Sequence, residues 1–327
     1  MPASRRRWSW SGRLPKKGWG RSSNKLRYRL CANYTQHGAC NWAISAENPN
    51  LLCRSCRLSE IIPDLNVPGN QQAWCRLEAA KRRMLYTLMQ LQLPIRGRDQ
   101  DPQYGLSYKF CADTSDARVL TGHARGVITL NIAEADDAER ERRRLKLREP
   151  YRTLLGHFRH EIGHYYWERL IAGAPRIEEF RRLFGDERED YAAALKRHYD
   201  QGPPADWQQR FVSAYATAHP WEDWAESWAH YLHMIDMLET AAAAGLSLEP
   251  SRRNEPALKR PRRGPAESFD RLMESWFPLA YICNNLNRSM GLADAYPFVV
   301  PPPAIAKMRF VHEVIAEVAK ANQQAAA

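Results

Sequence analysis

The chain has 327 residues, 44% of them hydrophobic, and its 48 Lys+Arg against 37 Asp+Glu give a formal charge of +11. This length exceeds one average domain and the apolar content suffices for a sizeable core, so composition excludes a wholly disordered chain. The charge is uneven, because residues 1–30 carry ten basic side chains and no acidic one, whereas the rest carries a net charge of +1. The sequence therefore describes a nearly neutral protein with a basic arm.

The sequence contains no uninterrupted apolar run of about 18 residues, and no apolar segment follows the basic start. It predicts neither a membrane helix nor an export signal. Seven cysteines are too few and too clustered for a disulfide framework, since four of them lie between residues 31 and 56. This clustering indicates metal binding in a reducing compartment, and we expect a cytoplasmic protein.

Three regions follow one another along the chain. Residues 1–27 lack a helix or strand period and predict a disordered basic arm. Residues 28–66 contain the clustered cysteines and predict a zinc-ribbon-like module, and residues 67–327 form the largest region. Within it, residues 250–265 combine four prolines with six basic side chains, so we expect a mobile, exposed insertion.

Apolar spacing and helix breakers predict an α+β fold that is mainly helical with a small sheet. A helix from Trp74 to Leu91 has apolar residues every three or four positions, and its opposite face is basic (Arg76, Lys81, Arg82 and Arg83). Short strands are expected at 106–110, 118–120 and 126–132. The charged run 139–148 predicts a solvated helix or loop. Further helices are expected at 151–171, 220–245, 267–289 and 303–321, with shorter ones within 176–213.

The segment His160-Glu161-Ile162-Gly163-His164 carries the chemistry. Two histidines four positions apart on a helix face the same way and can hold one zinc ion, and Glu161 then lies beside the metal. From there it can take a proton from zinc-bound water and pass it to a leaving amine. The alternative is a buried helix with two core histidines.

A catalytic zinc needs a third protein ligand and one open position. Metzincins would place Gly at position 167 and His at position 170, but Trp167 and Leu170 stand there, which excludes that class. We expect the ligand from another helix, with Glu222 as ligand and Glu226 as acceptor of a hydrogen bond from a ligand histidine. Competing ligands that rank lower by direction or distance are Asp223, His219, His230 and His233.

The pattern Glu-x-x-Ala-Glu from Glu222 to Glu226, downstream of HExxH, is similar to the third-ligand helix of gluzincin-type peptidases. In some of those enzymes a tyrosine seven residues before the glutamate assists the oxyanion. The resemblance implies that role for Tyr215, although the spacing alone fits a core aromatic residue equally well. His157 lies one turn before His160, where it can support the metal site, face substrate or be a polar surface residue.

Cys31, Cys40, Cys53 and Cys56 offer four thiolates, and the Cys53-x-x-Cys56 knuckle has the spacing of a structural zinc site. His37 in place of Cys40 is the main variation, and unrelated reduced thiols are the alternative. The three cysteines that stand alone are expected to be buried apolar residues, namely Cys75, Cys111 and Cys283.

Taken together, CANY, CNW and CRSCRL, the EAAKRR helix, HFRHEIGHYYW and HPWEDWAESWAHYLH resemble the bacterial family of "putative zinc-binding metallopeptidases" with an N-terminal zinc ribbon. The resemblance covers about residues 28–315 and implies a zincin-like domain with peptidase chemistry. Members of that family usually begin with a further pair of CxxC knuckles, which residues 1–27 lack.

We therefore expect a zinc metallopeptidase that holds one catalytic and one structural Zn²⁺ and cleaves a peptide or protein substrate. The strand at 127–132 shortly precedes the HExxH helix, as the cleft-edge strand does in zincins, so a peptide could add to it. One alternative is a zinc-ribbon protein that binds nucleic acid through the basic arm and its three tryptophans. Another is a zinc scaffold without catalysis.

Overall fold

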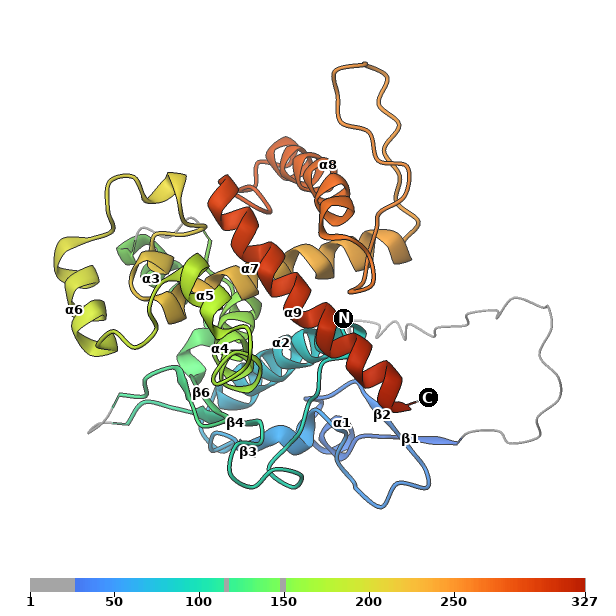
Figure 1. The fold of residues 1–327 in the computed structure, drawn as a ribbon. Coiled ribbons are helices and arrows are strands. Elements are labelled where there is room, and N and C mark those ends of the chain that lie inside the picture. The colour runs from blue at the N-terminus through green and yellow to red at the C-terminus, as the bar shows by residue number, and fades with distance from the viewer. Residues whose placement is uncertain (1–26, 115–117, 148–150, 327) are drawn as a thin grey trace, which may run out of the picture.

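The computed structural model describes residues 27–114, 118–147 and 151–326, so the predicted basic arm lies outside the described residues except for Arg27. Helices dominate, and small sheets lie at one side of the molecule (Figure 1). This arrangement confirms the predicted fold class. The elements are, in chain order, β1 Tyr28–Leu30, α1 Ala32–His37, β2 Ala43–Ser45, η1 Cys56–Leu58, β3 Ser59–Ile61, α2 Asn70–Gln90, β4 Ser107–Cys111, β5 Gly122–Ala124, β6 Val127–Asn131, η2 Ile132–Ala135, α3 Asp137–Leu147, α4 Leu154–Leu170, α5 Ile177–Phe184, α6 Tyr191–Gln201, η3 Trp207–Gln209, η4 Tyr215–Thr217, α7 Pro220–Ala243, α8 Phe269–Ser289 and α9 Pro302–Ala326.

Local signals account for the starts of the two helices that matter most. α4 begins after Thr153, whose side-chain oxygen accepts a hydrogen bond from the Gly156 amide at 3.0 Å. α7 begins with Pro220, and the preceding His219 accepts a hydrogen bond from the Trp221 amide. The long helices predicted from apolar spacing are confirmed, with ends that differ by a few residues.

The four-stranded sheet has the order β3-β4-β6-β5, in which β5 alone runs antiparallel to its neighbour. The strand predicted at 118–120 is wrong. The backbone of Val119 bonds to side chains and not to a neighbouring strand. Its amide donates to Asp113 at 2.7 Å, and its carbonyl accepts from Asn131 at 3.2 Å. The strand lies at Gly122–Ala124, and a tight turn joins it to β6. Gly126 in that turn has φ 81°, and a Cβ there would come within 2.5 Å of the Tyr104 carbonyl oxygen.

The position of β6 corrects the expected site of peptide addition. β6 pairs with β4 on one side and β5 on the other, so its backbone groups are already used. The edge strand beside the HExxH helix is β5, where the His123 ring lies 6.2 Å from the ring of Tyr165 on α4. Any extra strand on this side of the sheet would pair with β5.

α4 lies between the sheet and α7. Towards the sheet, the Phe158 ring lies 5.8 Å from the Tyr108 ring and 6.2 Å from the Phe110 ring. Towards α7, the Tyr166 ring stacks on the Trp228 ring at 5.0 Å. The HExxH helix is therefore held on two sides by the main hydrophobic core.

Two of the four basic residues predicted on one face of α2, Lys81 and Arg82, are buried, whereas Arg76 and Arg83 are exposed. The side chain of Lys81 is fully buried, and its Nζ lies 2.9 Å from Glu78 Oε1. Arg82 lies 3.6 Å from the other oxygen of Glu78 and donates to the Ala39 carbonyl at 2.6 Å. Because Glu78 supplies charge one turn away from both residues, the two cations can be buried, and Arg82 ties the cysteine-rich region to α2.

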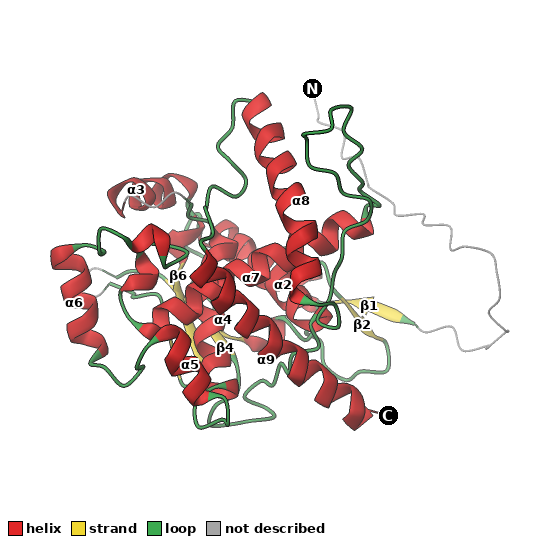
Figure 2. Cartoon of the chain, turned by 45° about the horizontal axis from the view of Figure 1, so that its top comes forward, coloured by secondary structure: helices red, strands yellow, loops and turns green. Residues whose placement is uncertain are grey.

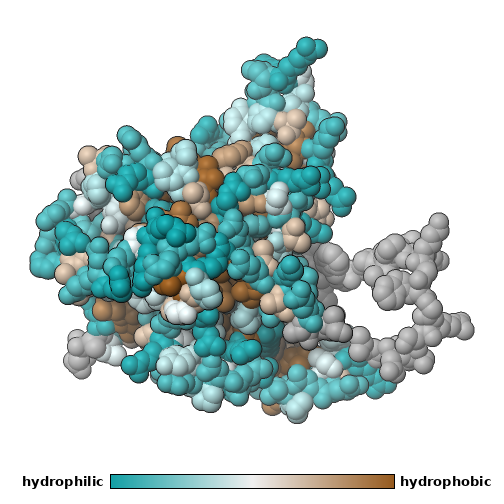
Figure 3. All heavy atoms as spheres, viewed as in Figure 1, coloured by the Kyte–Doolittle hydropathy of each residue, from teal (hydrophilic) through white to brown (hydrophobic). Residues whose placement is uncertain are grey.

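Residues 250–265 project from the body as an irregular loop near α8 (Figure 2). Its tip is hydrophilic on the face drawn in Figure 3. Most of the loop is exposed, but Leu258 and Pro261 are buried, and Leu258 bridges to Leu248. The mobility of the loop stays a prediction. Among the described residues, no helix is long and apolar enough to cross a membrane.

Candidate metal centre

His160, His164 and Glu222 bring three ligand atoms together between α4 and α7. The Nε2 atoms of the two histidines lie 3.2 Å apart, and Glu222 Oε2 lies 3.0 Å from that of His160 and 3.5 Å from that of His164. Glu222 is buried, and its Oε2 has no hydrogen-bond partner among the described residues. The third ligand expected from sequence thus meets both histidines.

The spacing of these atoms fits one zinc ion. Bonds of about 2.0–2.1 Å in a tetrahedron place neighbouring ligand atoms about 3.3 Å apart, close to the three separations described above. Two imidazole nitrogens and one carboxylate oxygen form a donor set used by catalytic zinc. A cation would also satisfy the buried carboxylate oxygen, whose charge would otherwise be costly.

A second carboxylate fixes the orientation of His160. Its Nδ1 lies 2.7 Å from Glu226 Oε1, and Ser213 donates a hydrogen bond to Glu226 Oε2 at 2.6 Å. Burial opposes ionisation, but the hydrogen bonds lower the pKa of Glu226 to about 2. A charged Glu226 therefore holds Nδ1 as the donor and leaves Nε2 directed at the ligand cluster.

A tyrosine that the sequence did not single out contacts Glu222. The Tyr191 hydroxyl donates to Glu222 Oε1 at 2.6 Å, while Oε2 faces the histidines. The ring of Tyr215 lies 5.9 Å from that of His160. Burial and the charge of Glu222 raise the pKa of both phenols, so both are neutral donors.

Glu161 lies on α4 next to His160 and is largely buried, at 8% exposed. Its Oε2 has no hydrogen-bond partner within the described part of the chain. After burial and Glu222, the charge of Glu161 also contributes to the raised pKa of Tyr191. The carboxylate is thus available for contact with a water molecule or a substrate.

Close packing of α4 on α7 brings Glu222 within reach of the histidines. A Cβ on Gly163 would lie 3.1 Å from the Ala225 Cα and 3.3 Å from the Trp228 Cβ, so only glycine permits this approach without a shift. The Trp224 indole donates to the Gly163 carbonyl at 2.9 Å and holds the two helices together. Gly163 within HEIGH therefore helps to bring Glu222 close to the two histidines.

The competing ligands have other partners. Asp223 Oδ2 lies 2.5 Å from Lys307 Nζ in a buried ion pair. His219 Nε2 donates to the Glu189 carbonyl at 3.2 Å, and His230 Nδ1 lies 2.7 Å from the Tyr296 hydroxyl. The His233 ring lies among aromatic rings of the core. None of them belongs to the ligand cluster found among the described residues.

His157 lies beside the centre, on the same helix. Its Nδ1 is 3.1 Å from Oε2 of the buried Glu134, which follows β6. This contact links α4 to the segment that follows β6. A role of His157 towards substrate stays a prediction.

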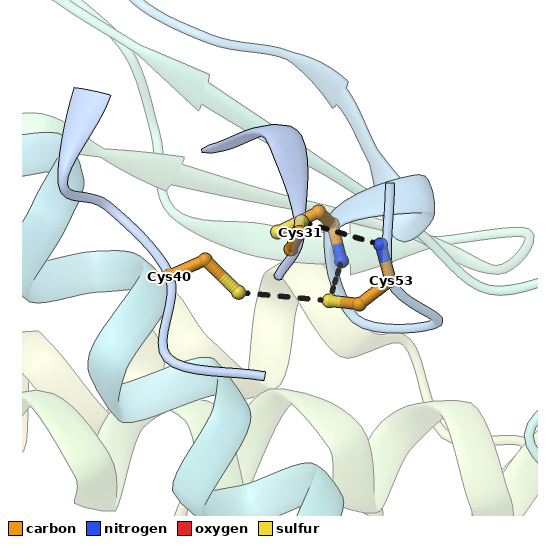
Figure 4. A group of neighbouring side chains, drawn as sticks. Cys31, Cys40 and Cys53 are labelled. Atoms are coloured by element: carbon orange, nitrogen blue, oxygen red, sulfur yellow. Dashed lines mark hydrogen bonds between the residues drawn. The ribbon is translucent and has the colours of Figure 1, made fainter. Parts of the chain in front are cut away.

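The four cysteines predicted as ligands form a second cluster, with their sulfur atoms within 4.8 Å of one another. Figure 4 shows three of them, Cys31, Cys40 and Cys53. The Cys40 and Cys53 sulfurs lie 3.7 Å apart, close to the separation of about 3.8 Å that Zn–S bonds of about 2.3 Å give in a tetrahedron. Backbone amides point at the sulfurs, from Cys53 to Cys31 at 3.3 Å and from Trp42 to Cys40 at 3.4 Å.

The other residues discussed for this region lie outside the cluster. His37 packs its ring 5.5 Å from the Trp74 ring. The cysteines that stand alone are only partly buried, which corrects the expectation for Cys75, Cys111 and Cys283.

Comparison with known proteins agrees with this geometry. Residues 70–314 match a family described as "putative zinc-binding metallo-peptidase". The chain belongs to this family. Residues 13–67 match a zinc-ribbon domain, so this metallopeptidase family member carries its ribbon at the N-terminal side.

Relatives of this family member occur in mycobacteria. Uncharacterized proteins of Mycobacterium bovis and of two Mycobacterium tuberculosis strains are 49% identical to it over 293 residues, which is 89% of this chain and 83% of each relative. No solved structure matches it.

Sequence reasoning missed Tyr191 and Ser213. Tyr191 precedes Glu222 by 31 residues and Ser213 lies in an irregular segment, so neither shares a helical spacing with a ligand. The local signals near them are an N-cap at Asp190 and the break at Gly202-Pro203-Pro204. These signals place helix ends, but they do not indicate contact with a metal centre.

Proposed function

We propose that this chain is a zinc-dependent peptidase with its catalytic centre at His160, His164 and Glu222. The observation that carries the proposal is the triangle of Nε2, Nε2 and Oε2 atoms, 3.0–3.5 Å apart. Glu161 follows His160 on α4, and its Oε2 has no hydrogen-bond partner among the described residues. Zinc held there would polarise the scissile carbonyl and make an attacking water more acidic. The four-cysteine cluster is the proposed structural zinc site.

The residues around the ligands have distinct proposed roles. Glu161 takes a proton from the attacking water as general base and then delivers it to the departing amine as general acid. Glu226 orients His160, and Tyr215 stays a candidate hydroxyl donor to the oxyanion. His157, paired with Glu134, would support the position of α4 rather than touch the reacting atoms.

The proposed substrate is an extended segment of a peptide or protein. β5 is a free sheet edge beside α4, and backbone pairing to such an edge binds extended chains regardless of their sequence. The aromatic rings of Tyr191 and Trp221 lie 5.8 Å apart, and the Tyr191 hydroxyl contacts the ligand Glu222. Pairing to the edge of the sheet favours an extended peptide over a compact small molecule.

We also propose a reducing compartment, such as the cytoplasm, because the four clustered thiols must stay reduced to hold zinc. Residues 28–66 and 67–327 are the proposed ribbon and peptidase regions. Nucleic-acid binding by the basic arm is the second function expected from sequence, and no observation on the described residues favours it.

The experiment that tests the main proposal is digestion of an unbiased peptide library by the purified full-length chain. We expect cleavage that stops when zinc is chelated and returns when zinc is restored. Glu161→Gln should keep its zinc and lose at least a hundredfold in rate, within the range of about 10²–10⁴ that general acid–base catalysis contributes. An active Glu161→Gln protein would remove Glu161 from the mechanism, and an inactive zinc-loaded wild type would refute the peptidase function.

A further inference from the structure

We propose that Tyr191 is a positioning residue that makes Glu222 a one-oxygen ligand of the metal. This inference rests on the metal centre of the proposed function and concerns what its third ligand does. It assigns a role to a hydroxyl that comes from α6, outside both helices that carry the ligands.

The two oxygens of Glu222 face different partners. Oε1 accepts the hydrogen bond of 2.6 Å from Tyr191, whereas Oε2 is the atom 3.0 Å from His160 Nε2 and 3.5 Å from His164 Nε2. The Glu222 side chain is 1% exposed, so bulk water does not compete for either oxygen. One carboxylate oxygen therefore contacts the Tyr191 hydroxyl, and the other faces the ligand histidines.

This division has a consequence for coordination. A carboxylate can bind zinc through one oxygen or through both, and the second oxygen would occupy the position that a catalytic site leaves open. A short hydrogen bond from a neutral phenol engages Oε1 and turns it away from that position. Tyr191 thus limits the protein to three coordinating atoms, one from each ligand residue.

The surrounding structure holds the Tyr191 hydroxyl in place. The Asp190 carboxylate caps α6 by accepting from the Ala193 amide at 3.0 Å. His219, just before α7, uses Nδ1 to accept from the Trp221 amide at 3.1 Å and Nε2 to donate to the Glu189 carbonyl at 3.2 Å. The start of α6 is therefore tied to the start of α7, three residues before Glu222.

Ring contacts complete this support. The Tyr191 ring lies 5.2 Å from the His219 ring and 5.8 Å from the Trp221 ring. A residue that only filled space here would need the ring and not the oxygen. Tyr191→Phe keeps the ring and removes the hydrogen bond to Glu222, so it separates the two roles.

The test replaces zinc by Co²⁺, whose visible absorption is strong with four ligands and weaker with five. The double variant His160→Ala/His164→Ala keeps the four cysteines and supplies the blank for cobalt bound by thiolates. Tyr199→Phe is the matched control, because it removes a phenol from the same helix at a site that is 63% exposed. Spectra and cobalt affinity are measured on the full chain.

We expect a four-coordinate spectrum for wild type and Tyr199→Phe, and a weaker, five-coordinate spectrum for Tyr191→Phe, with affinity changed by about tenfold as for other groups that orient ligands. A Tyr191→Phe spectrum identical to wild type overturns the inference whatever its affinity, and so does a wild type that is already five-coordinate. A four-coordinate wild type that cleaves no peptide would refute the hydrolytic function alone, because the spectroscopic comparison does not depend on turnover.

Discussion

At the scale of single residues, the metal centre contains buried charged side chains that stabilise one another. Each of them alone would be costly to bury. Burial alone would lower the pKa of His160, yet Glu222 and Glu226 raise it well above its usual value in the metal-free chain. A proton there occupies the place that a cation takes when metal binds, so acid and metal compete for this histidine.

A second buried histidine links stability to pH. Burial, with a smaller effect of Arg159, lowers the pKa of His230 to about 4, against about 6.5 in an unfolded chain. Below about pH 6.5 His230 binds a proton in the unfolded chain, but in the folded chain it does so only near pH 4. The free energy of unfolding therefore falls as pH falls through this window. One such group contributes about 3 kcal/mol across the full window.

Urea unfolding of wild type and His230→Gln at several pH values between 4 and 7 measures this contribution. Glutamine can still hydrogen-bond to Tyr296, 2.7 Å from His230 Nδ1, but does not titrate in this range. We expect a smaller loss of stability on acidification for His230→Gln than for wild type. Parallel pH dependences for the two proteins would contradict the assignment.

At the scale of secondary-structure elements, the centre depends on one helix–helix contact. The ligand histidines belong to α4 and Glu222 to α7, and Gly163 sets how closely these helices approach. Gly163→Val should force them apart and destabilise the protein by about 1–3 kcal/mol, as overpacking does elsewhere. It should also weaken zinc binding, since Glu222 would move away from both histidines.

Thermal unfolding and zinc competition with a chelator measure the two effects. Gly122→Val is the matched control for stability, because a Cβ at Gly122 meets no atom within 4 Å and its φ is not positive. If Gly163→Val and Gly122→Val lose the same stability and zinc affinity, the close approach of α4 and α7 is not what positions the ligand.

The same contact shows which parts of the site sequence could predict. His160 and His164 follow from helix geometry alone, because a spacing of four residues fixes their direction. Glu222 followed from its pairing with Glu226 and from resemblance, whereas its approach to the histidines depends on tertiary packing at Gly163. Tyr191 could not be predicted, since its contact depends on how the start of α6 packs beside the start of α7, which leaves no period in the sequence.

The sheet was harder to predict than the helices for a related reason. β5 has three residues, too few to establish an alternating pattern, and the backbone of Val119 just before it bonds to the Asp113 and Asn131 side chains. Which strand lies at an edge depends on pairing between strands far apart in sequence, so the order β3-β4-β6-β5 had no local signal.

At the scale of the whole molecule, the two metal clusters share no residue. We therefore expect two zinc ions per chain in wild type. Two double variants should each retain one zinc ion, because each removes one ligand set. They are Cys53→Ala/Cys56→Ala and His160→Ala/His164→Ala. Metal analysis of the purified proteins after gel filtration measures these ratios. Two ions in either double variant would show that the removed residues are not ligands.

The pairing of β3 with β4 makes the cysteine-rich region difficult to detach. β3 begins three residues after Cys56 and forms one edge of the four-stranded sheet beside β4, which carries the buried Tyr108 and Phe110. A recombinant fragment that started at residue 67 would lack this strand and leave the β4 backbone open to pairing with other molecules. Proteins made for crystallisation or assay should therefore keep the cysteines together with α4 and α7, since shortening the chain at the apparent boundary would create an aggregation-prone surface.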